Sequence, residues 1–491
     1  MTNKPLTEPQ KKQSDSIVDT VLSGQHGKHS FQTVYTYIHT RIQRGDWQAH
    51  AKLPSVRQLA EDTGMHRLTI FKAYQHLKDD GHVYARDKSG YYVQPPTLQV
   101  LTNEAELGLP LFQGNLGDLH RIQVKYQFSQ ALITPNLLPN HYFAEYVKQV
   151  FDLYPKLLGT YAPAQGDLEL REMLQHYFTD TSQFHVHADE ILITTGAQQA
   201  ISLIAEVWIR PGDYVLIESP AYASALDVFQ QKGARLVPMT IDANGYDLAQ
   251  IEQAMKQYKP RFFYLNPTFH NPTGICISAE QRKQLVDLAA QYQCLLIEDD
   301  TCQDIYFGQK PPLPLFAYDT EGYTIYIRSF SKYVSPGLRI ACIVARPEWF
   351  TSLLAAKSLA DGGTPLLNQK VFLHYFTSTR LQQHIEKLRI ALRIRFEMMD
   401  EELSSTGWYY EPPQGGFNLW VRLPDHLSVP ELLARCLKQS ISFVPGSLFD
   451  HHESSKQYIR LCFSFASEQE IRTGIQQLVA IAKDMESNSS E

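Results

Sequence analysis

The 491-residue sequence has few cysteines and no long apolar segment. Its six cysteines are scattered without a C-x-x-C pair, so neither a disulfide framework nor a metal site is predicted. No apolar run approaches the ~18 residues of a membrane span, and the N-terminus lacks the apolar core of a signal peptide. These absences predict a soluble cytoplasmic protein without a membrane partner, and the length predicts two or three domains.

Charge is unevenly distributed along the chain. The net charge is -7, but residues 31–94 contain nine Lys/Arg and six Asp/Glu, so this segment carries +3 and the remainder -10. A basic segment on an acidic protein is a weak indication of nucleic-acid binding.

Residues 31–94 have the periodicity of three helices followed by two short strands. Apolar residues recur at helical spacing from Phe31 to Ile42, and Ser55 and Gln58 have the spacing of a capping box. The third helix should bury a stripe and expose an opposite face, with Thr69 and Phe71 at its margins. The stripe is Ile70, Ala73, Tyr74 and Leu77, and the opposite face is Leu68, Lys72 and Gln75. This order predicts a winged helix-turn-helix whose third helix enters the major groove, preceded by a disordered tail at 1–30.

The same segment resembles the GntR family of bacterial regulators. The resemblance rests on Leu53-Pro54-Ser55-x-Arg57, Arg67-x-Thr69, Ala73-Tyr74-x-x-Leu77, Gly81 and Gly90. It implies that Arg57, Arg67 and Thr69 meet DNA, together with Lys72, and that Gly90 brings the wing close to a phosphate. His66 stands where the family usually has a capping serine, so we expect a weaker cap and a different base contact. The alternative is that Arg57 and Arg67 are solvated surface charges.

A predicted linker at 95–125 separates this segment from a larger domain at 126–491. If flexible, the ~30 linker residues would span roughly 30 Å. Beyond the linker, strand-like runs alternate with helical ones, at 191–195, 213–218, 262–266, 294–298, 323–328 and 338–345. The pattern predicts an α/β domain with a mostly parallel sheet, in which ligands bind beyond the carboxyl ends of the strands.

The stretch from Arg328 to Arg339 places a lysine just past a predicted strand. Lys332 offers an amine that condenses with an aldehyde, while Ser329 and Ser331 can donate hydrogen bonds to a phosphate. Arg339 can hold the same phosphate with its planar fork. Together they suit pyridoxal 5'-phosphate (PLP). The alternative is a serine-lysine turn with a surface arginine.

Other candidate residues follow the remaining strand-like runs. A glycine turn at Gly196 opens a helix and forms a potential anion site, or a plain strand-to-helix turn. Tyr222 could stack on a pyridine or belong to the core, and Asn271 could donate to the PLP phenolate or only shape a turn. The triplet Glu298-Asp299-Asp300 offers a carboxylate for a pyridinium nitrogen. A metal site is the alternative there, but no further ligand stands nearby.

In this order the motifs resemble fold-type I PLP enzymes, in particular the aminotransferase group that includes 2-aminoadipate aminotransferases. The resemblance implies that Lys332 forms the Schiff base, Asp299 meets the ring nitrogen and Asn271 donates to the phenolate. It further implies that Tyr222 stacks on the ring. It also implies that the phosphate is held by Ala197, Gln198, Ser329 and Arg339, and that Tyr161 reaches the phosphate of the neighbouring subunit. The substrate carboxylate would be bound by Arg460.

One departure from these relatives concerns the phenolate oxygen. They commonly place a second donor, a tyrosine, two or three residues after the aspartate, where this chain has Thr301 and Cys302. Unless Tyr306 replaces it, the ionised oxygen is stabilised less. Transamination is therefore in doubt, whereas cofactor binding is not.

A GntR-type module fused to an aminotransferase-like domain resembles the MocR/GabR subfamily of transcription regulators. This implies a homodimeric, PLP-dependent regulator that binds operator DNA and senses an amino acid or amine by aldimine exchange at Lys332. The first alternative is an active aminotransferase with a vestigial DNA module. The second is a regulator that has lost PLP and keeps the domain for dimerisation, which the intact Lys332, Asp299, Asn271 and Arg339 argue against.

Overall fold

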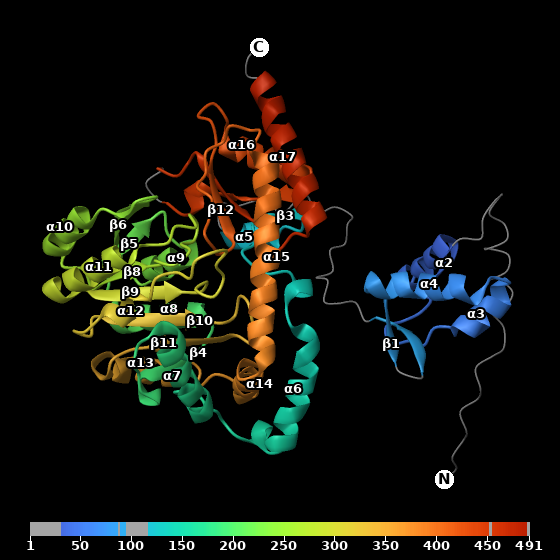
Figure 1. Cartoon of the computed structure of the whole chain (residues 1–491), viewed down its shortest axis with the longest axis horizontal. Coiled ribbons are helices and arrows are strands. Elements are labelled where there is room, and N and C mark those ends of the chain that lie inside the picture. Colours follow the sequence, from blue (N-terminus) through green and yellow to red (C-terminus); the bar gives the residue numbers. More distant parts are fainter. Residues whose placement is uncertain (1–30, 87–88, 95–115, 451–453, 489–491) are drawn as a thin grey trace, which may run out of the picture. The chain divides into compact units, whose positions relative to one another are not determined.

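The computed structural model describes residues 31–86, 89–94, 116–450 and 454–488. The chain divides into two compact units, one before and one after residue 108 (Figure 1). The predicted tail at 1–30 and residues 95–115 of the predicted linker lie outside the described residues. Among the helices that are described, none is both long and apolar enough to cross a membrane.

The smaller unit contains three helices and a two-stranded antiparallel ribbon. They are α2 (Phe31–Gln43), α3 (Val56–Thr63), α4 (Arg67–Asp79), β1 (Val83–Arg86) and β2 (Gly90–Val93). Residues from all five elements bury one core, which includes Val34, Leu59, Ile70, Tyr74, Leu77, Val83 and Val93. The predicted winged helix-turn-helix order is therefore present, with the predicted stripe of α4 facing inward.

The ribbon is attached to α4 through aromatic and polar contacts. The rings of Tyr74 and Tyr91 stack with centroids 4.5 Å apart, and Gln75 Nε2 donates to Tyr91 Oη at 2.9 Å. Gly90 has φ +107°, a backbone conformation that favours glycine at the start of β2. These contacts fix the ribbon relative to α4 as one piece.

The larger unit is built on an eight-stranded sheet in the order β4-β11-β10-β9-β8-β5-β6-β7. Strands β5, β6, β8, β9 and β10 are parallel to their neighbours in this group, whereas β11 runs antiparallel to both β4 and β10. The strands are β4 (Ile191–Thr195), β5 (Tyr214–Ser219), β6 (Arg235–Asp242), β7 (Gly245–Tyr246), β8 (Phe262–Leu265), β9 (Leu295–Asp300), β10 (Thr324–Ser329) and β11 (Ile340–Val344). The predicted mostly parallel sheet is thus confirmed.

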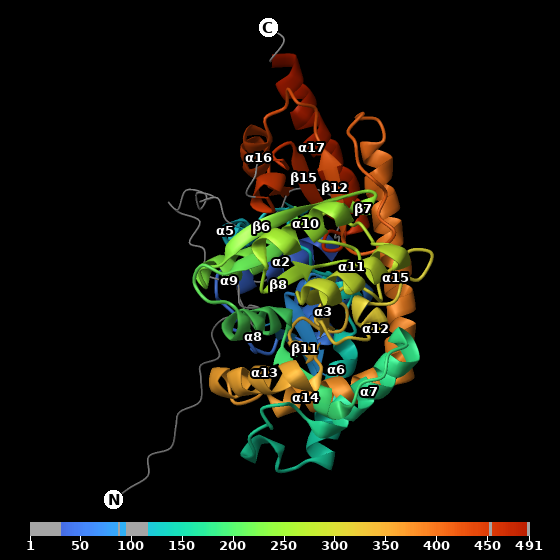
Figure 2. The same cartoon turned by 90° about the vertical axis from the view of Figure 1, so that its left-hand side faces the viewer.

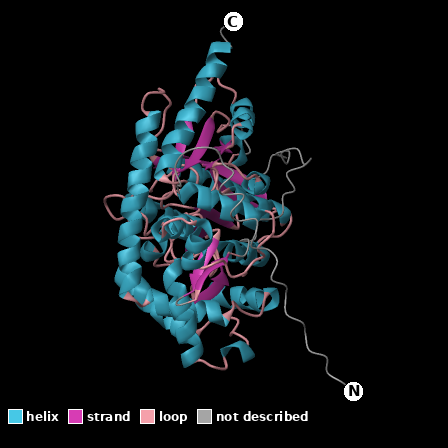
Figure 3. Cartoon of the chain, turned by 90° about the vertical axis from the view of Figure 1, so that its right-hand side faces the viewer, coloured by secondary structure: helices cyan, strands magenta, loops and turns pink. Residues whose placement is uncertain are grey.

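Helices cover both faces of this sheet (Figures 2 and 3). Successive strand residues alternate between the faces, so that Ile217 packs in one core cluster and Leu216 in another. The first cluster includes residues of α8 (Ala197–Trp208), α9 (Ala223–Gln231) and α13 (Pro347–Ala360), and the second those of α10 (Leu248–Tyr258), α11 (Ala279–Tyr292) and α12 (Leu315–Tyr318). Burial on both faces explains why these strands read as continuous apolar runs.

A second part of the larger unit contains two small sheets. They combine β12 (Asn418–Arg422), β15 (Tyr458–Cys462) and β14 (Val444–Pro445), and β13 (Ile441–Ser442) with β3 (Tyr126–Gln127). We call residues 408–488 with β3 the C-terminal part; its helices are α16 (Val429–Lys438) and α17 (Glu468–Asn488). The long helix α15 (Thr379–Leu403) runs from α14 (Leu366–Phe376) to this part (Figure 1).

Helices and 3-10 turns precede β4 in the larger unit. These are α5 (Leu116–Arg121), η1 (Pro135–Leu137), α6 (Asn140–Leu153), η2 (Leu157–Gly159), α7 (Leu168–Ser182) and η3 (Ala188–Glu190), and η4 (Gly446–Leu448) follows β14. Helix α5 lies inside the predicted linker, and Leu119 and Ile122 are buried in the main core cluster. Residues 116–125 are therefore packed with the larger unit.

Candidate functional site

The candidate residues of the larger unit, apart from Tyr161, gather beyond the carboxyl ends of the parallel strands, which we call the ligand-binding edge of the eight-stranded sheet. Strand β10 ends at Ser329, and the following loop carries Lys332 and leads to Arg339, directly before β11. Because β11 runs antiparallel to β10, the end of one strand and the start of the other lie at the same edge. The parallel strands β5, β8 and β9 also end there, which brings together residues that are far apart in sequence.

Lys332 is half-buried at the ends of these strands, and its amine is held by a backbone carbonyl. Its Nζ donates to the carbonyl oxygen of Ala131 at 2.9 Å. Burial lowers the pKa of Lys332 and outweighs the raising effect of Cys302 and Cys462, and the nearby Arg460 and Arg339 lower the pKa as well. A lowered pKa favours the neutral amine, which is the form that attacks an aldehyde.

Gly196 and Arg339 form an anion cradle at the start of α8. Gly196 has φ +80°, and a Cβ there would lie 2.3 Å from Arg339 Nη2, so only glycine permits this approach. Arg339, itself at φ +57°, donates from Nη2 to the carbonyl oxygen of Thr195 at 3.2 Å. The N–H groups of Ala197 and Gln198 begin the helix, where its dipole favours an anion. A phosphate fits this donor set.

The two predicted serines differ in their present hydrogen bonds. Ser331 Oγ donates to the carbonyl oxygen of Ile340 at 3.3 Å, so its hydroxyl proton already has an acceptor. Ser329 Oγ instead accepts from the backbone N–H of Ser331 at 3.4 Å, which leaves its own proton to donate. Ser329 is therefore the better placed of the two as a phosphate donor, and the role of Ser331 stays a prediction.

Asp299 presents one carboxylate oxygen that the described residues leave without a hydrogen bond. Its Oδ2 accepts from Tyr264 Oη at 2.6 Å, whereas its Oδ1 is buried and unpaired. Burial raises the pKa of Asp299 to about 6. A buried carboxylate oxygen without a donor is costly, and a pyridinium N–H would supply that donor. The donor chemistry at Asp299 therefore fits the ring of PLP.

Glu298 and Asp300 have partners of their own, so the acidic triplet does not act as one cluster. Glu298 accepts from the backbone N–H groups of Leu315 and Phe316 at 2.9 and 3.1 Å. Asp300 pairs with Arg328 Nη1 at 3.1 Å on the other side. Across the described part of the chain, no group of His, Cys, Asp and Glu is arranged to hold a metal ion. The three acids therefore serve three separate purposes.

Asn271 and Arg460 are brought together although 189 residues separate them. Arg460 donates from Nη1 to Asn271 Oδ1 at 2.9 Å and from Nη2 to the carbonyl oxygen of Ser129 at 2.5 Å. Asn418 also donates to Asn271 Oδ1, at 3.3 Å. With two donors on its oxygen, Asn271 keeps its amide N–H₂ as the group that can donate to a phenolate.

The environment of Arg460 is that of a buried binding group. The residue is only 1% exposed, and its Nε has no hydrogen-bond partner among the described residues. The ring of Phe449 lies 5.0 Å from the guanidinium, which supports it from one side. A carboxylate would satisfy this arginine by taking over one or both of its present contacts.

Tyr222 lies directly before α9 and is half-buried. Burial raises the pKa of its phenol, with a further contribution from the Asp299 carboxylate, while Arg460 and Arg339 lower it. The tyrosine is thus close to the three residues expected to bind the ring nitrogen, a carboxylate and the phosphate. This position agrees with a stacking role but leaves it a prediction.

The position of the missing tyrosine is occupied by a buried thiol. Cys302 lies 3.5 Å from Thr301 Oγ1, and burial raises its pKa to about 12, so it remains a neutral, weak donor. Tyr306 does not replace the phenol, because the guanidinium of Arg389 lies over its ring at 3.7 Å and its backbone pairs with Gly415. The weaker stabilisation of the phenolate stays a prediction.

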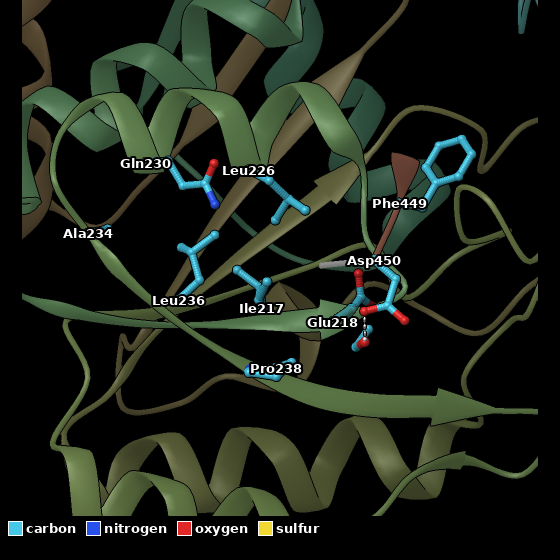
Figure 4. Close-up of a pocket in the computed structure, with 10 residues that line it drawn as sticks. Ile217, Glu218, Leu226, Gln230, Ala234, Leu236, Pro238, Phe449 and Asp450 are labelled. Atoms are coloured by element: carbon cyan, nitrogen blue, oxygen red, sulfur yellow. Dashed lines mark hydrogen bonds between the residues drawn. The ribbon is translucent and has the colours of Figure 1, made fainter. Parts of the chain in front are cut away.

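A cavity of about 180 Å³ lies beside this site, between α9 and strands β5 and β6 (Figure 4). Its polar end contains Glu218 and Asp450, but the protein itself engages both carboxylates. Glu218 accepts from the N–H of Asn266 at 2.9 Å, and Asp450 accepts from Ser219 Oγ at 3.1 Å. The remaining lining is largely aliphatic. The described residues of the cavity lining therefore include no cationic group for the carboxylate of an amino acid.

Tyr161 extends from a loop whose other end is fixed. The Gln165 side chain donates to the carbonyl oxygen of Ile191 at 3.2 Å, and its backbone accepts from Ile193 at 2.9 Å. A Cβ on Gly166 would lie 2.3 Å from the Ile193 side chain, so the loop packs tightly on β4. Tyr161 itself is fully exposed. It makes no part of the site within its own chain.

The predicted DNA-contacting residues lie on and around α4 in the smaller unit. His66 is the N-cap, and its Nδ1 accepts from the N–H of Leu68 at 3.2 Å, so it does cap the helix. Arg67 and Lys72 are exposed and Thr69 is half-buried. Arg57 is exposed too but pairs with Glu61 at 3.0 Å, one turn later on α3. A phosphate contact by Arg57 would have to compete with this surface ion pair.

Sequence reasoning missed several residues that support the site. The alternation of buried residues could have indicated Tyr264, because it is on the same sheet face as Ile297 and therefore as Asp299. Ala131, Ser129 and Asn418 carried no sequence signal, since they act through a backbone carbonyl or through pairing of distant strands.

Two family descriptions match the chain. Residues 147–478 match aminotransferase class I and II, and residues 31–93 match the gntR family of bacterial regulatory proteins. The chain belongs to the aminotransferase class I and II family. Its N-terminal unit is a GntR-type DNA-binding domain, which confirms the predicted fold class. The fold and the donor set at the strand ends imply PLP as the cofactor.

Individual relatives fall into two groups. The 2-aminoadipate transaminase of Thermus thermophilus is 33% identical over 72% of this chain and 88% of its own length. YdfD of Bacillus subtilis, an uncharacterized HTH-type transcriptional regulator, is 29% identical over 93% of this chain and 97% of its own length. YisV, another such regulator from that organism, is 30% identical over 91% and 94%. The regulators thus share both units, as expected for the MocR/GabR type.

A solved structure shows the same relationship for the larger unit. LysN, the α-aminoadipate aminotransferase of Thermus thermophilus in complex with N-(5'-phosphopyridoxyl)-L-leucine, superposes with a TM-score of 0.71. It is 31% identical and covers 77% of this chain and 96% of its own.

Proposed function

We propose that this protein is a PLP-dependent transcription regulator that binds operator DNA and responds to an amino acid or amine. The observation that carries the proposal is the presence of both units in one chain, in the order found in the full-length regulator relatives. An operator-binding protein acts where the chromosome is, so we assign it to the bacterial cytoplasm.

The larger unit would bind PLP with the residues at the strand ends. Gly196, Ala197, Gln198, Ser329 and Arg339 would hold the phosphate, with Ser331 as a further candidate. Asp299 would accept the pyridinium proton, Asn271 would donate to the phenolate and Tyr222 would cover the ring. PLP supplies an aldehyde for a primary amine and an electron sink. Lys332 would supply that amine in the resting protein, and its lowered pKa would keep it in the neutral form that attacks the aldehyde.

Arg460 is the group that would distinguish amino acids from simple amines. Its buried guanidinium already has two oxygen acceptors, and an incoming carboxylate would displace the weaker interactions with Asn271 or Ser129. Displacing Arg460 from Asn271 would also change the environment of the phenolate donor. Effector carboxylate and cofactor would therefore be sensed by one connected pair of side chains.

A cleft between the two parts of the larger unit would respond to a movement of Arg460. It measures about 470 Å³ and is lined by Ser219, Thr240 and Thr273 from one part and by Tyr409, Trp420 and Tyr458 from the C-terminal part. Trp420 pairs with Arg460 across β12 and β15, so a movement of Arg460 would act on the cleft. A difference between open and closed states is what an effector needs to change DNA affinity.

We further propose a homodimer in which Tyr161 completes the phosphate site of the partner. Tyr161 is fully exposed in the loop between η2 and α7. Further exposed apolar residues lie on α6, η2 and α7, which all pack on α14. They are Phe151, Leu153, Leu158 and Leu168. Such a patch marks an interaction surface. Sedimentation as a monomer in the presence of PLP would refute this assembly.

An active aminotransferase with a vestigial DNA module is the second candidate, supported by the relatives that are transaminases. The thiol of Cys302 in the place of a phenol argues against efficient turnover. The presence of an exposed, well-formed α4 with cationic Arg67 and Lys72 argues against a vestigial DNA module.

One experiment on one sample separates the two candidates. Purified protein with PLP is screened against a panel of amino acids and amines by absorbance, and each responding compound is added to operator DNA titrations and to a keto-acid product assay. We expect a responding compound to change DNA affinity by roughly 5–150-fold. Lys332→Ala should keep DNA binding and lose the response, whereas Lys283→Ala, at an exposed lysine of α11, should keep both. Robust turnover with unchanged DNA affinity would overturn the regulator proposal.

A further inference from the structure

The first two turns of α4 expose two large apolar side chains. Leu68 is 56% exposed and Phe71 is 44% exposed, whereas Ile70 between them is fully buried. At 100° per residue, Leu68 lies opposite the buried stripe and Phe71 at the margin of the same outward face. Large exposed apolar side chains side by side on a helix indicate a surface that another molecule covers.

The surroundings of this pair are cationic. Arg67 and Lys72 flank it and are exposed, and α4 has no acidic residue before Asp79. Gln75, the next polar residue on the outward face, is engaged by Tyr91 of the wing and so is less available to read a base. The outward face of the first two turns therefore combines apolar contacts at its centre with positive charge at its edges.

This combination matches one feature of duplex DNA. The phosphates demand cations, and the only apolar group that the major groove presents is the C5-methyl group of thymine. The N-terminal turns of a recognition helix are the ones that contact base edges. An apolar pair in these turns is thus suited to thymine rather than to guanine or cytosine.

We propose that Leu68 and Phe71 read two thymine methyl groups in each operator half-site, which is the stretch of operator that one smaller unit contacts. The proposal rests on the DNA-binding function of the smaller unit and specifies which bases it selects. Three residues along a helix advance about 4.5 Å, and stacked base pairs are about 3.4 Å apart. The two methyl groups therefore belong to neighbouring base pairs or to pairs one step further apart.

The test removes single methyl groups from the DNA. Duplexes are selected from a random library with the full-length PLP-bound protein, and the preferred duplex is resynthesised with deoxyuridine in place of each thymidine in turn. We expect two positions per half-site at which affinity falls about fourfold, the effect of one buried methyl group. Replacement at the other thymidines should have little effect, because the phosphates and hydrogen-bonding edges are unchanged.

Two variants assign the two positions. Leu68→Ala should abolish the deoxyuridine effect at one position and Phe71→Ala at the other, since each removes one side of a pairwise contact. Both side chains are exposed, so the core of the unit is left intact. Ile390→Ala, at a 62% exposed residue of α15, should behave as the wild type at every position.

Three results would overturn the inference. One is a wild-type protein that is indifferent to every deoxyuridine replacement, and another is retention of both effects in both variants. The third is a change of sedimentation in Leu68→Ala or Phe71→Ala with unchanged DNA affinity, which would make this face a protein interface. Failure to select any duplex would instead refute the DNA-binding function itself.

Discussion

Replacement of Asp299 by asparagine separates what this carboxylate costs the protein from what it does for the cofactor. The side chain is buried, one oxygen is held by Tyr264 and the other has no partner among the described residues. Asparagine keeps the shape and an acceptor for Tyr264 but removes the charge. It should therefore relieve a cost in the cofactor-free protein and weaken the interaction with a pyridinium.

The magnitude follows from the pKa of Asp299. Burial raises it from 3.8 to about 6 in the folded protein. At 1.36 kcal/mol per pKa unit, keeping this group ionised at pH 7 costs the folded state about 3 kcal/mol. Because the folded pKa is raised, the protonated Asp299 carries no such cost below pH 4. The cost appears as pH rises and is nearly complete above pH 6, so the folded state is most stable with respect to this group at low pH.

The assay is thermal unfolding with and without PLP at pH 5 and pH 8. Without PLP, Asp299→Asn should be more stable than the wild type at pH 8, with a smaller difference at pH 5. The additional stabilisation by PLP should decrease, because it depends on the ratio of ligand concentration to Kd. Wild-type PLP affinity in the variant, or a stability difference that is independent of pH, would refute the assigned role.

Tyr264→Phe is the matched control for this prediction. It leaves the Asp299 carboxylate in place but removes the hydrogen bond that lowers its pKa. The pH at which Asp299 loses its contribution to stability should therefore move upward, and PLP affinity should fall less than in Asp299→Asn. An unchanged pH profile would show that Tyr264 does not control the charge of Asp299.

Three further substitutions test other parts of the site. Cys302→Tyr should increase keto-acid formation relative to Cys302→Phe, which fills the same space without a hydroxyl; equal rates would remove the phenol from the explanation. Arg460→Ala should raise the concentration of a carboxylate effector needed for a response while leaving the response to simple amines, as followed by absorbance. Arg67→Ala should weaken operator binding by about 1–3 kcal/mol if it reads a base and leave the PLP spectrum unchanged, and wild-type affinity at physiological salt would exclude that role.

The sequence by itself predicted the elements of the smaller unit in order and six of the eight strands of the main sheet, whereas β6 and β7 were not predicted. Runs of apolar residues that are bounded by turn residues predict strands β4, β5 and β8–β11, because the two-residue and 3.6-residue periods are local properties of the chain. The motifs that follow these strands predict which residues reach the ligand-binding edge, since parallel strands end on the same side. The capping serine, the stripe of α4 and the wing were predictable for the same reason.

Only the tertiary structure decided which side chains meet and which remain free. Asn271 and Arg460 pair across 189 residues, and Gly196 is required by the guanidinium of Arg339. These contacts depend on sheet register and on the packing of the C-terminal part, which no local pattern encodes. For the same reason, the unpaired oxygen of Asp299 and the docking of residues 116–125 on the larger unit appear only in the folded chain.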